Sequence, residues 1–591
     1  MIARKDQKVE NTWDLSLLCP SAEVWEKEIE DIKGKLDQAA SFQGKLGLSS
    51  DNLYEALSFL RDTYMNLERL GSWAFLNYSA DGEDPDNQRR AGIAQQVESL
   101  FEEKLSYFDP ELFEIDPAKL NDWMKEDRFE EFRVYLEKTL RYKEHVLSKE
   151  GENLLALFSP LSSSSQEAFQ DLNNIDLDFG EINGTKLTHS TYSFFMNSND
   201  ENLRKQAYMQ LYKEYEQHQN VIARLYSSSI KKDIFTAKAR GYNSSLEKSL
   251  FPDRMPKSVY TSLIESVHEA FPILHRYYKL RAKLMGKDKL KHWDVYTPLV
   301  KEAKTTHTYD EAVELIKGAV APLGQEYTDV IIKGLTTDRW VDRYENKAKR
   351  SGAFSAGGYI GNPYILTNFE DQVIRSVFTL IHEGGHSMHS YYSAKNNPFM
   401  SYNYTIFEAE VASTFNENLL FKYLLNNAKT EQERISLIGT KLDDTVATLF
   451  RQTMFAEFEL LAHEAAENGI PTTTAWLRNT YRQLLVSYFG PDLEFEDVSD
   501  LEGLRIPHFY TAFYCYKYAT GISASIALSE RVLNGGDKER EDYLNFLKSG
   551  GSTYPLDSLK KAGVDMSTPE PVKKATEYFA QLLDEMERLT K

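Results

Sequence analysis

Residues 378–389 read Phe378-Thr379-Leu380-Ile381-His382-Glu383-Gly384-Gly385-His386-Ser387-Met388-His389. An α-helix turns about 100° per residue, so His382 and His386 project from one face, one turn apart. Two imidazoles at this spacing can share one Zn²⁺ at about 2.0–2.1 Å each. Glu383 lies one step round the helix, within reach of a water on the same side. The H-E-x-x-H pattern therefore predicts two zinc ligands and the general base of a metallopeptidase, with a plain polar helix face as the alternative.

A zinc site of this kind needs a third protein ligand. His389 shares the face of His382 and His386. However, it lies seven residues beyond His382, which is about 10.5 Å along a helix axis, too far for one ion to bind both ends of the row. We therefore expect His389 to line the cleft or to orient a neighbour.

An acid on a second helix is the other solution for the third ligand. Residues 406–417 read Ile406-Phe407-Glu408-Ala409-Glu410-Val411-Ala412-Ser413-Thr414-Phe415-Asn416-Glu417. Glu410 and Glu417 share one helical face, whereas Glu408 points away from both. We expect Glu410 to bind the metal and Glu417 to support a ligand histidine, with a solvent-facing acid as the alternative for Glu417.

The sequence resembles the thimet oligopeptidase and oligoendopeptidase F family of zinc metallopeptidases, and the oligoendopeptidase F branch most closely. The resemblance rests on four stretches: residues 381–390, 407–414, 508–521 and 237–247. One departure is Gly384, which stands where relatives usually carry a larger apolar residue. Glycine inside a helix costs about 1 kcal/mol against alanine, so the pair Gly384-Gly385 weakens this helix.

The resemblance implies a mainly α, two-lobed, zincin-like fold with a deep substrate channel, a small β element near the active site and one Zn²⁺ per chain. It also implies that a histidine and the tyrosines after it donate hydrogen bonds to the oxyanion. We assign this role to His508 with Tyr510, Tyr514 and Tyr518, and Tyr516 remains a further candidate. The spacing of four places Tyr510, Tyr514 and Tyr518 on one helical stripe. The alternative is that these tyrosines only pack in the core.

A glycine-rich stretch, residues 350–368, precedes the metal helix. Residues 364–369 are expected to form a strand. In zincin-like enzymes an edge strand at this place pairs with the extended substrate backbone, which gives affinity without reading side chains. We expect Gly352 and Ala353 to contact substrate, and the alternative is an ordinary connecting loop.

Composition excludes several classes of partner. The 591 residues include 69 Lys and Arg against 90 Asp and Glu, a net charge of −21, which opposes binding to nucleic acid or to an anionic membrane. The sequence has no uninterrupted apolar run of about 20 residues, so we expect no membrane span. Cys19 and Cys515 are the only cysteines. Together with an N-terminus that lacks a signal-like apolar run, they indicate a cytoplasmic protein.

Most of the chain shows helical periodicity. We expect residues 1–110 to form an N-terminal helical segment that walls the channel, residues 111–200 a helical segment with a small β-hairpin, and residues 201–591 the catalytic domain. Asn183-Gly184 predicts the hairpin turn. Ser159-Pro160 predicts a turn, and the serines that follow it are expected to end one helix and cap the next.

Three functions fit these patterns. The first is a zinc endopeptidase that acts on short, unfolded peptides, with Glu383 as general base. The second is a carboxypeptidase or dipeptidyl carboxypeptidase with the same metal site. It would need a cation that holds the substrate's terminal carboxylate. The third is a peptide-binding protein without catalysis, which would have no reason to keep Glu383. The sequence leaves side-chain preference and oligomeric state open.

Overall fold

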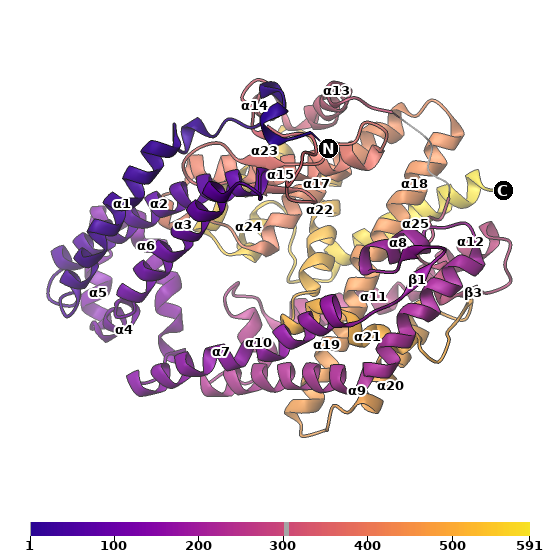
Figure 1. Cartoon of the computed structure of the whole chain (residues 1–591), viewed down its shortest axis with the longest axis horizontal. Helices are drawn as coiled ribbons and strands as arrows, with labels where there is room; N and C mark the ends of the chain where they lie inside the picture. Colours follow the sequence, from indigo (N-terminus) through magenta and orange to yellow (C-terminus); the bar gives the residue numbers. More distant parts are fainter. Residues whose placement is uncertain (1, 301–305) are drawn as a thin grey trace. The chain divides into compact units, whose positions relative to one another are not determined.

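The computed structural model describes residues 2–300 and 306–591, and most of them are helical (Figure 1). The chain forms two compact units. The first comprises Met1–Glu144, Lys304–Leu424 and Leu528–Gly563, and the second comprises His145–Ala303, Leu425–Ala527 and Val564–Lys591. The expected mainly α, two-lobed fold is confirmed, and the division at residues 110 and 200 stays a prediction. None of the described helices is long and apolar enough to cross a membrane.

The first unit contains the metal helix and the N-terminal helices. Its helices are α1 (Ala22–Ala39), α2 (Ser50–Ala80), α3 (Pro85–Lys104), α4 (Phe108–Glu114), α5 (Pro117–Trp123), α6 (Glu130–Leu140), α13 (Tyr309–Val320), α14 (Gln325–Leu335), α15 (Ile374–Asn396), α16 (Phe399–Tyr402), α17 (Ile406–Asn427), α23 (Asp537–Ser549) and α24 (Pro555–Lys561). The last residues of α17 belong to the second unit.

The N-terminal helices bury an apolar face against one another. Helices α1, α2 and α3 lie side by side, coloured indigo to purple in Figure 1. Trp25 is fully buried between them, and its indole Nε1 donates to the carbonyl of Leu70 at 2.9 Å. Burying a side chain of this size contributes about 1.5–3 kcal/mol, so the stripe of apolar residues that predicts α1 also fixes it against α2.

A small sheet precedes the metal helix in the first unit. Its strands are β4 (Val341–Asp342), β5 (Phe354–Ala356) and β6 (Tyr364–Leu366), in the order β4-β6-β5. β6 pairs parallel with β4 and antiparallel with β5. The predicted strand at 364–369 is therefore present, but its expected edge position is wrong. β6 is the central strand, which agrees with the complete burial of its residues, and β5 lies at the edge.

The second unit is also helical. It contains α7 (Lys149–Asp171), α8 (His189–Met196), α9 (Glu201–Ala239), α10 (Ser245–Leu250), α11 (Lys257–Glu269), α12 (Phe271–Leu284), α18 (Glu431–Thr445), α19 (Gln452–Glu467), α20 (Thr474–Phe489), α21 (Glu502–Arg505) and α25 (Glu570–Leu589). Helix α22 (Tyr516–Asn534) begins in this unit and ends in the first. The strands β3 (Leu290–Lys291) and β7 (Leu493–Glu494) pair parallel.

The predicted β-hairpin is confirmed. β1 (Glu181–Ile182) and β2 (Thr185–Lys186) pair antiparallel around Asn183-Gly184. Both turn residues have positive φ, 51° and 78°, which is the conformation that a two-residue type I′ turn requires.

The turn predicted at Ser159-Pro160 is wrong, because α7 continues through both residues. A proline inside a helix removes one backbone hydrogen bond. The serines that follow remain helical, and the Ser163 hydroxyl donates back to the Pro160 carbonyl at 3.2 Å. These serines therefore neither end a helix nor cap the next one.

Candidate metal centre

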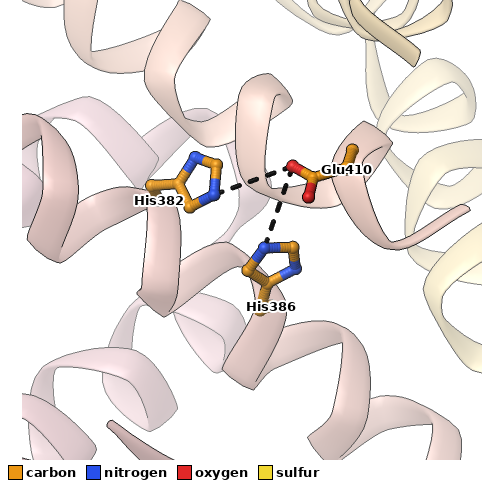
Figure 2. A group of neighbouring side chains, drawn as sticks. All are labelled: His382, His386 and Glu410. Carbon is orange, nitrogen blue, oxygen red and sulfur yellow. Dashed lines mark ion pairs between the residues drawn. The ribbon is translucent and has the colours of Figure 1, made fainter. Parts of the chain in front are cut away.

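Helices α15 and α17 of the first unit carry the candidate metal ligands. His382 and His386 lie on one face of α15, with ring centroids 4.9 Å apart and ring planes at 82°. Glu410 faces them from α17, with its Oε2 atom 3.7 Å from Nε2 of His382 and 4.0 Å from Nε2 of His386 (Figure 2). The three side chains that the sequence predicts as ligands, His382, His386 and Glu410, therefore lie in one cluster.

The geometry of this cluster fits a zinc ion. Two ligands of a tetrahedral zinc stand about 3.4 Å apart when each bond is about 2.1 Å, and the three candidate ligand atoms all lie within 4.8 Å of one another, so small side-chain movements would bring them to a shared ion. Two imidazole nitrogens and one carboxylate oxygen are also the ligand types that zinc prefers. Within residues 2–300 and 306–591, this is the one group of three or more such side chains that could hold a metal.

Glu417 orients one ligand. Its carboxylate accepts a hydrogen bond from Nδ1 of His382, and Nε2 of that ring faces Glu410 at the candidate metal position. Burial opposes protonation of His382, but the hydrogen bond and charge of Glu417, helped by Glu383 and Glu410, raise its pKa to about 9 while no metal is bound. Glu417 lies about two helical turns beyond Glu410 on α17, and its hydrogen bond to His382 agrees with the expected support, which stays a prediction.

Glu383 lies beside the ligands and is almost completely buried, with 7% of its surface exposed. Burial raises the pKa of its carboxyl to about 7. The charge of His382 lowers this pKa, Glu410 and Glu417 raise it, and the backbone N–H of Ser355 on β5 lowers it. A carboxylate in these surroundings can take up and release a proton near neutral pH.

Glycine at position 385 brings the two ligand helices together. A Cβ atom there would lie 2.6 Å from the carbonyl oxygen of Ala412 and 2.8 Å from Cα of Ser413, both in the backbone of α17. Gly384 differs, because a Cβ there would meet only the end of the Ile331 side chain, at 3.1 Å. Because Gly385 has no Cβ, α15 and α17 can approach closely, and this approach sets the distance between the two histidines and Glu410.

The edge strand β5 lies next to Glu383. Ser355 of β5 contacts α15 twice. Its N–H interacts with Glu383, and its hydroxyl is 2.8 Å from the hydroxyl of Ser387. Ser387 in turn donates to the carbonyl of Pro363 at 3.1 Å, just before β6. Sequence reasoning did not single out Ser355 or Ser387, although Ser387 directly follows His386.

Gly352 and Ala353 lie in the turn that leads into β5. Gly352 has φ = 81°, in the left-handed region that favours glycine, and its carbonyl accepts a hydrogen bond from the amide Nδ2 of Asn368 at 2.9 Å. The two residues are thus positioned next to the edge strand. Their contact with substrate stays a prediction.

His389 does not line a cleft. Its ring is completely buried and stacks on Tyr404, with centroids 3.6 Å apart. Burial lowers the pKa of His389 to about 3, so the ring is neutral. The His389 ring also lies 5.3 Å from that of Phe546 on α23, so this residue of α15 packs in the core of the first unit.

The second unit carries the predicted oxyanion donors, and the expected helical stripe is wrong. Tyr510 ends a 3₁₀ helix (Pro507–Tyr510), Tyr514 lies in the connection and Tyr518 lies in α22. Phe513 has φ = 56°, which interrupts any continuous helix. Tyr510, Tyr514 and Tyr518 are therefore spaced by four residues without lying on one continuous helix.

Three of the four predicted donors still meet. The rings of His508 and Tyr514 are parallel, at 4° and 5.7 Å, and the Tyr518 hydroxyl donates to that of Tyr514 at 3.3 Å. Tyr510 points elsewhere. It is buried, and its ring stacks on Phe169 at 4.4 Å. Tyr510 therefore belongs to the core, as the alternative interpretation held.

Known proteins are similar to this chain over its whole length. The model of Peptidase family M3 matches residues 194–578, and a model described as Oligopeptidase F matches residues 111–179. The oligoendopeptidase F homolog of Borreliella burgdorferi is 42% identical over 590 residues, with 100% of both chains covered. Oligopeptidase PepF of Bacillus subtilis is also 42% identical, and the alignment covers 99% of this chain and 88% of that protein.

A solved structure shows the same fold. The crystal structure of oligoendopeptidase-F from Enterococcus faecium has a TM-score of 0.75 and 33% sequence identity, and covers 96% of this chain and 98% of its own. The family match spans the candidate metal centre and more than half of the residues. The chain therefore belongs to peptidase family M3.

Proposed function

We propose that this chain is a zinc endopeptidase that hydrolyses internal peptide bonds of short, unstructured peptides, with one Zn²⁺ per chain. The observation that carries the proposal is the cluster of His382, His386 and Glu410 with the buried carboxylate of Glu383 beside it. A centre that only bound peptides would have no need of a buried carboxylate beside the metal position.

Each side chain of the candidate metal centre has a distinct role in this proposal. His382, His386 and Glu410 hold the zinc, which when bound would polarise the scissile carbonyl and lower the pKa of a water. Glu383 accepts the proton of the attacking water and later delivers it to the leaving amine. Ser355 keeps the Glu383 carboxylate in place through its N–H. Glu417 holds the His382 ring in the tautomer that leaves Nε2 free.

The extended substrate would pair with β5. This strand lies at the edge of the sheet, and it contacts α15 beside Glu383. A peptide added to this edge gains main-chain hydrogen bonds without a requirement for particular side chains. Gly352 and Ala353, in the turn before β5, would contact the same peptide.

His508 and Tyr514 are the proposed donors to the oxyanion. The support is their parallel packing in the second unit and the hydrogen bond from Tyr518, which restrains the Tyr514 hydroxyl. Tyr510 is left out of this role because its ring is buried against Phe169.

The names of the relatives support short peptides as substrates, since two of them are named oligoendopeptidase F and one oligopeptidase. We propose that a channel too narrow for a folded domain imposes this limit, so native globular proteins should be spared. The net charge of −21 opposes binding to nucleic acid, and a cytoplasmic location is part of the proposal.

One assay tests the proposal against its alternatives. The purified protein is incubated with an internally quenched peptide blocked at both ends, and zinc is measured on the same sample. Cleavage that stops with a chelator and returns with zinc supports an endopeptidase. Cleavage of only those peptides that have a free C-terminus would favour a carboxypeptidase. Stoichiometric zinc with no cleavage of any peptide would favour a binding protein.

A further inference from the structure

Glu459 is a buried acid in the second unit, on the side of α19 that faces the Tyr514 connection. Its side chain is completely buried. Its Oε1 atom accepts the backbone N–H of Phe513 at 2.9 Å, across 54 positions of sequence. A carboxylate with no access to solvent cannot reach a substrate, so its role has to be sought in what it holds.

The carboxylate interacts with both neighbours of Tyr514. Besides the N–H of Phe513, the thiol and the N–H of Cys515 interact with Glu459. Burial raises the pKa of Glu459 to about 8, and these three donors lower it. One side chain on α19 thus fixes the backbone immediately before and immediately after Tyr514.

The backbone between these anchors is strained. Phe513 has φ = 56°, a conformation that side-chain-bearing residues rarely adopt. Its ring is buried, 4.6 Å from the His463 ring and 5.7 Å from that of Tyr260. Conformations of this kind persist only where the surroundings over-determine them, and they cluster at functional sites.

The strained turn directs Tyr514. Its side chain is only half-buried, so packing alone does not fix it. Its contacts are the parallel ring of His508 and the hydroxyl of Tyr518. The direction of the Tyr514 ring therefore depends on the backbone at Phe513 and Cys515.

We propose that Glu459 is a positioning residue, whose carboxylate holds the Phe513–Cys515 backbone so that Tyr514 faces His508 and Tyr518 in the arrangement that the reaction uses. This inference rests on the proposed function of Tyr514 as a donor to the oxyanion. Glu459 acts through Tyr514 and touches neither substrate nor metal.

The test compares three variants by kcat, KM, zinc content and amide hydrogen exchange of residues 509–516. Glu459→Met keeps the volume and removes the oxygen that accepts the Phe513 N–H. Glu459→Gln keeps one acceptor for the Phe513 N–H. Thr453→Val is the matched control, because Thr453 is equally buried on α19 but donates only to the Leu449 carbonyl of the preceding turn.

We expect kcat of Glu459→Met to fall about 10²-fold, because displacing a catalytic group by about 1 Å can reduce the rate by that factor. KM and zinc content should change little. Exchange at residues 509–516 should speed up at least tenfold. Glu459→Gln should have a kcat between those of Glu459→Met and the wild type. If Glu459→Met does not fold, Glu459→Gln alone tests the proposal. Thr453→Val should lose stability but keep kcat and the protection of residues 509–516.

A second experiment separates this inference from the proposed function. If Glu459 acts through Tyr514, the double variant Glu459→Met/Tyr514→Phe should be no slower than Tyr514→Phe. Additive losses, or wild-type kcat in both Glu459 variants while Tyr514→Phe is slow, would overturn the positioning role and leave the oxyanion role standing. Wild-type kcat in Tyr514→Phe would overturn the oxyanion role and the catalytic part of this inference. The exchange data would still decide whether Glu459 holds the turn.

Discussion

Glu417 accepts a hydrogen bond from Nδ1 of His382, while Nε2 of the same ring points at Oε2 of Glu410. One imidazole therefore contacts two acids of α17, Glu417 as the acceptor of its proton and Glu410 as the proposed second ligand of the same metal. This arrangement restrains the plane of the ring before a metal arrives.

Replacing Glu417 by Gln should weaken zinc binding without abolishing it. Loss of the carboxylate partner of a ligand histidine typically costs 10- to 100-fold in metal affinity, and we expect a change of about that size. Activity should return at excess zinc. Zinc competition with a chromophoric chelator measures the affinity.

Glu326→Gln is the control for this prediction, since Glu326 is an exposed acid of the same unit with one long ion pair, to Lys395 at 3.5 Å. It should bind zinc as the wild type does. Equal zinc affinity in Glu417→Gln and Glu326→Gln would show that Glu417 does not support the ligand.

Glu410→Gln should lose most of its zinc and its activity, because an amide oxygen is a weaker ligand than a carboxylate. Glu408→Gln tests the choice between the two acids. Glu408 is buried and accepts a hydrogen bond from the Ser558 hydroxyl at 2.6 Å, so its replacement should lower the melting temperature and leave zinc in place. The reverse pattern in a zinc assay would mean that the ligand is misassigned.

Glu383→Gln should keep zinc and peptide binding but lose turnover. General acid–base catalysis contributes about 10²–10⁴-fold, and the fall in kcat should be at least that large. Zinc analysis and equilibrium binding of a non-cleaved peptide check that the centre is intact. If the variant lost its zinc, Glu383 would be needed for structure rather than for proton transfer.

Gly385→Ala should disturb the metal centre, whereas Gly384→Ala should not. The Cβ at 385 would meet the α17 backbone at 2.6 Å, so the helices have to separate, and zinc affinity and melting temperature should both fall. At 384 the neighbour is the flexible end of Ile331, at 3.1 Å, and alanine gains up to about 1 kcal/mol of helix propensity. Equal zinc affinity in the two variants would contradict the role of Gly385 as a spacer.

Tyr514→Phe removes a hydroxyl and keeps the ring. If this hydroxyl donates to the oxyanion, kcat should fall about 10²–10³-fold with KM little changed. Steady-state kinetics on the blocked peptide measures both constants.

Tyr510→Phe is the matched control. The Tyr510 hydroxyl is buried and has no hydrogen-bond partner within the described residues, so its removal should leave kcat unchanged and stability unchanged or higher. A slow Tyr510→Phe beside a normal Tyr514→Phe would reverse the assignment of the two tyrosines.

The cluster of His382, His386 and Glu410 was predictable from the sequence because its geometry is largely local. The positions of His382 and His386 follow from the pitch of one helix, and the common face of Glu410 and Glu417 follows from that of another. The hairpin at Asn183-Gly184 was predictable for the same reason, since both residues of its turn favour positive φ.

Features that depend on distant partners were not predictable. The order of a sheet cannot be read from one strand, so β6 was expected at the edge and lies in the middle. The spacing of Tyr510, Tyr514 and Tyr518 imitates a helix, and only the turn at Phe513 shows otherwise. Glu459 was missed because the groups known to bind it belong to Phe513 and Cys515, two of them backbone N–H groups that have no pattern in a sequence.

The short separation of the metal ligands along the chain has a consequence for synthesis. Glu417 follows His382 by 35 positions, so at about 5–20 residues per second the ribosome adds the whole set within about 2–7 s. Tyr514 follows Glu417 by another 514 − 417 = 97 residues, which takes about 5–19 s at the same rate. A nascent chain that ends at Glu417 carries every proposed ligand but not Tyr514. Zinc captured at that stage would enter a chain that is not yet able to cut the peptides around it.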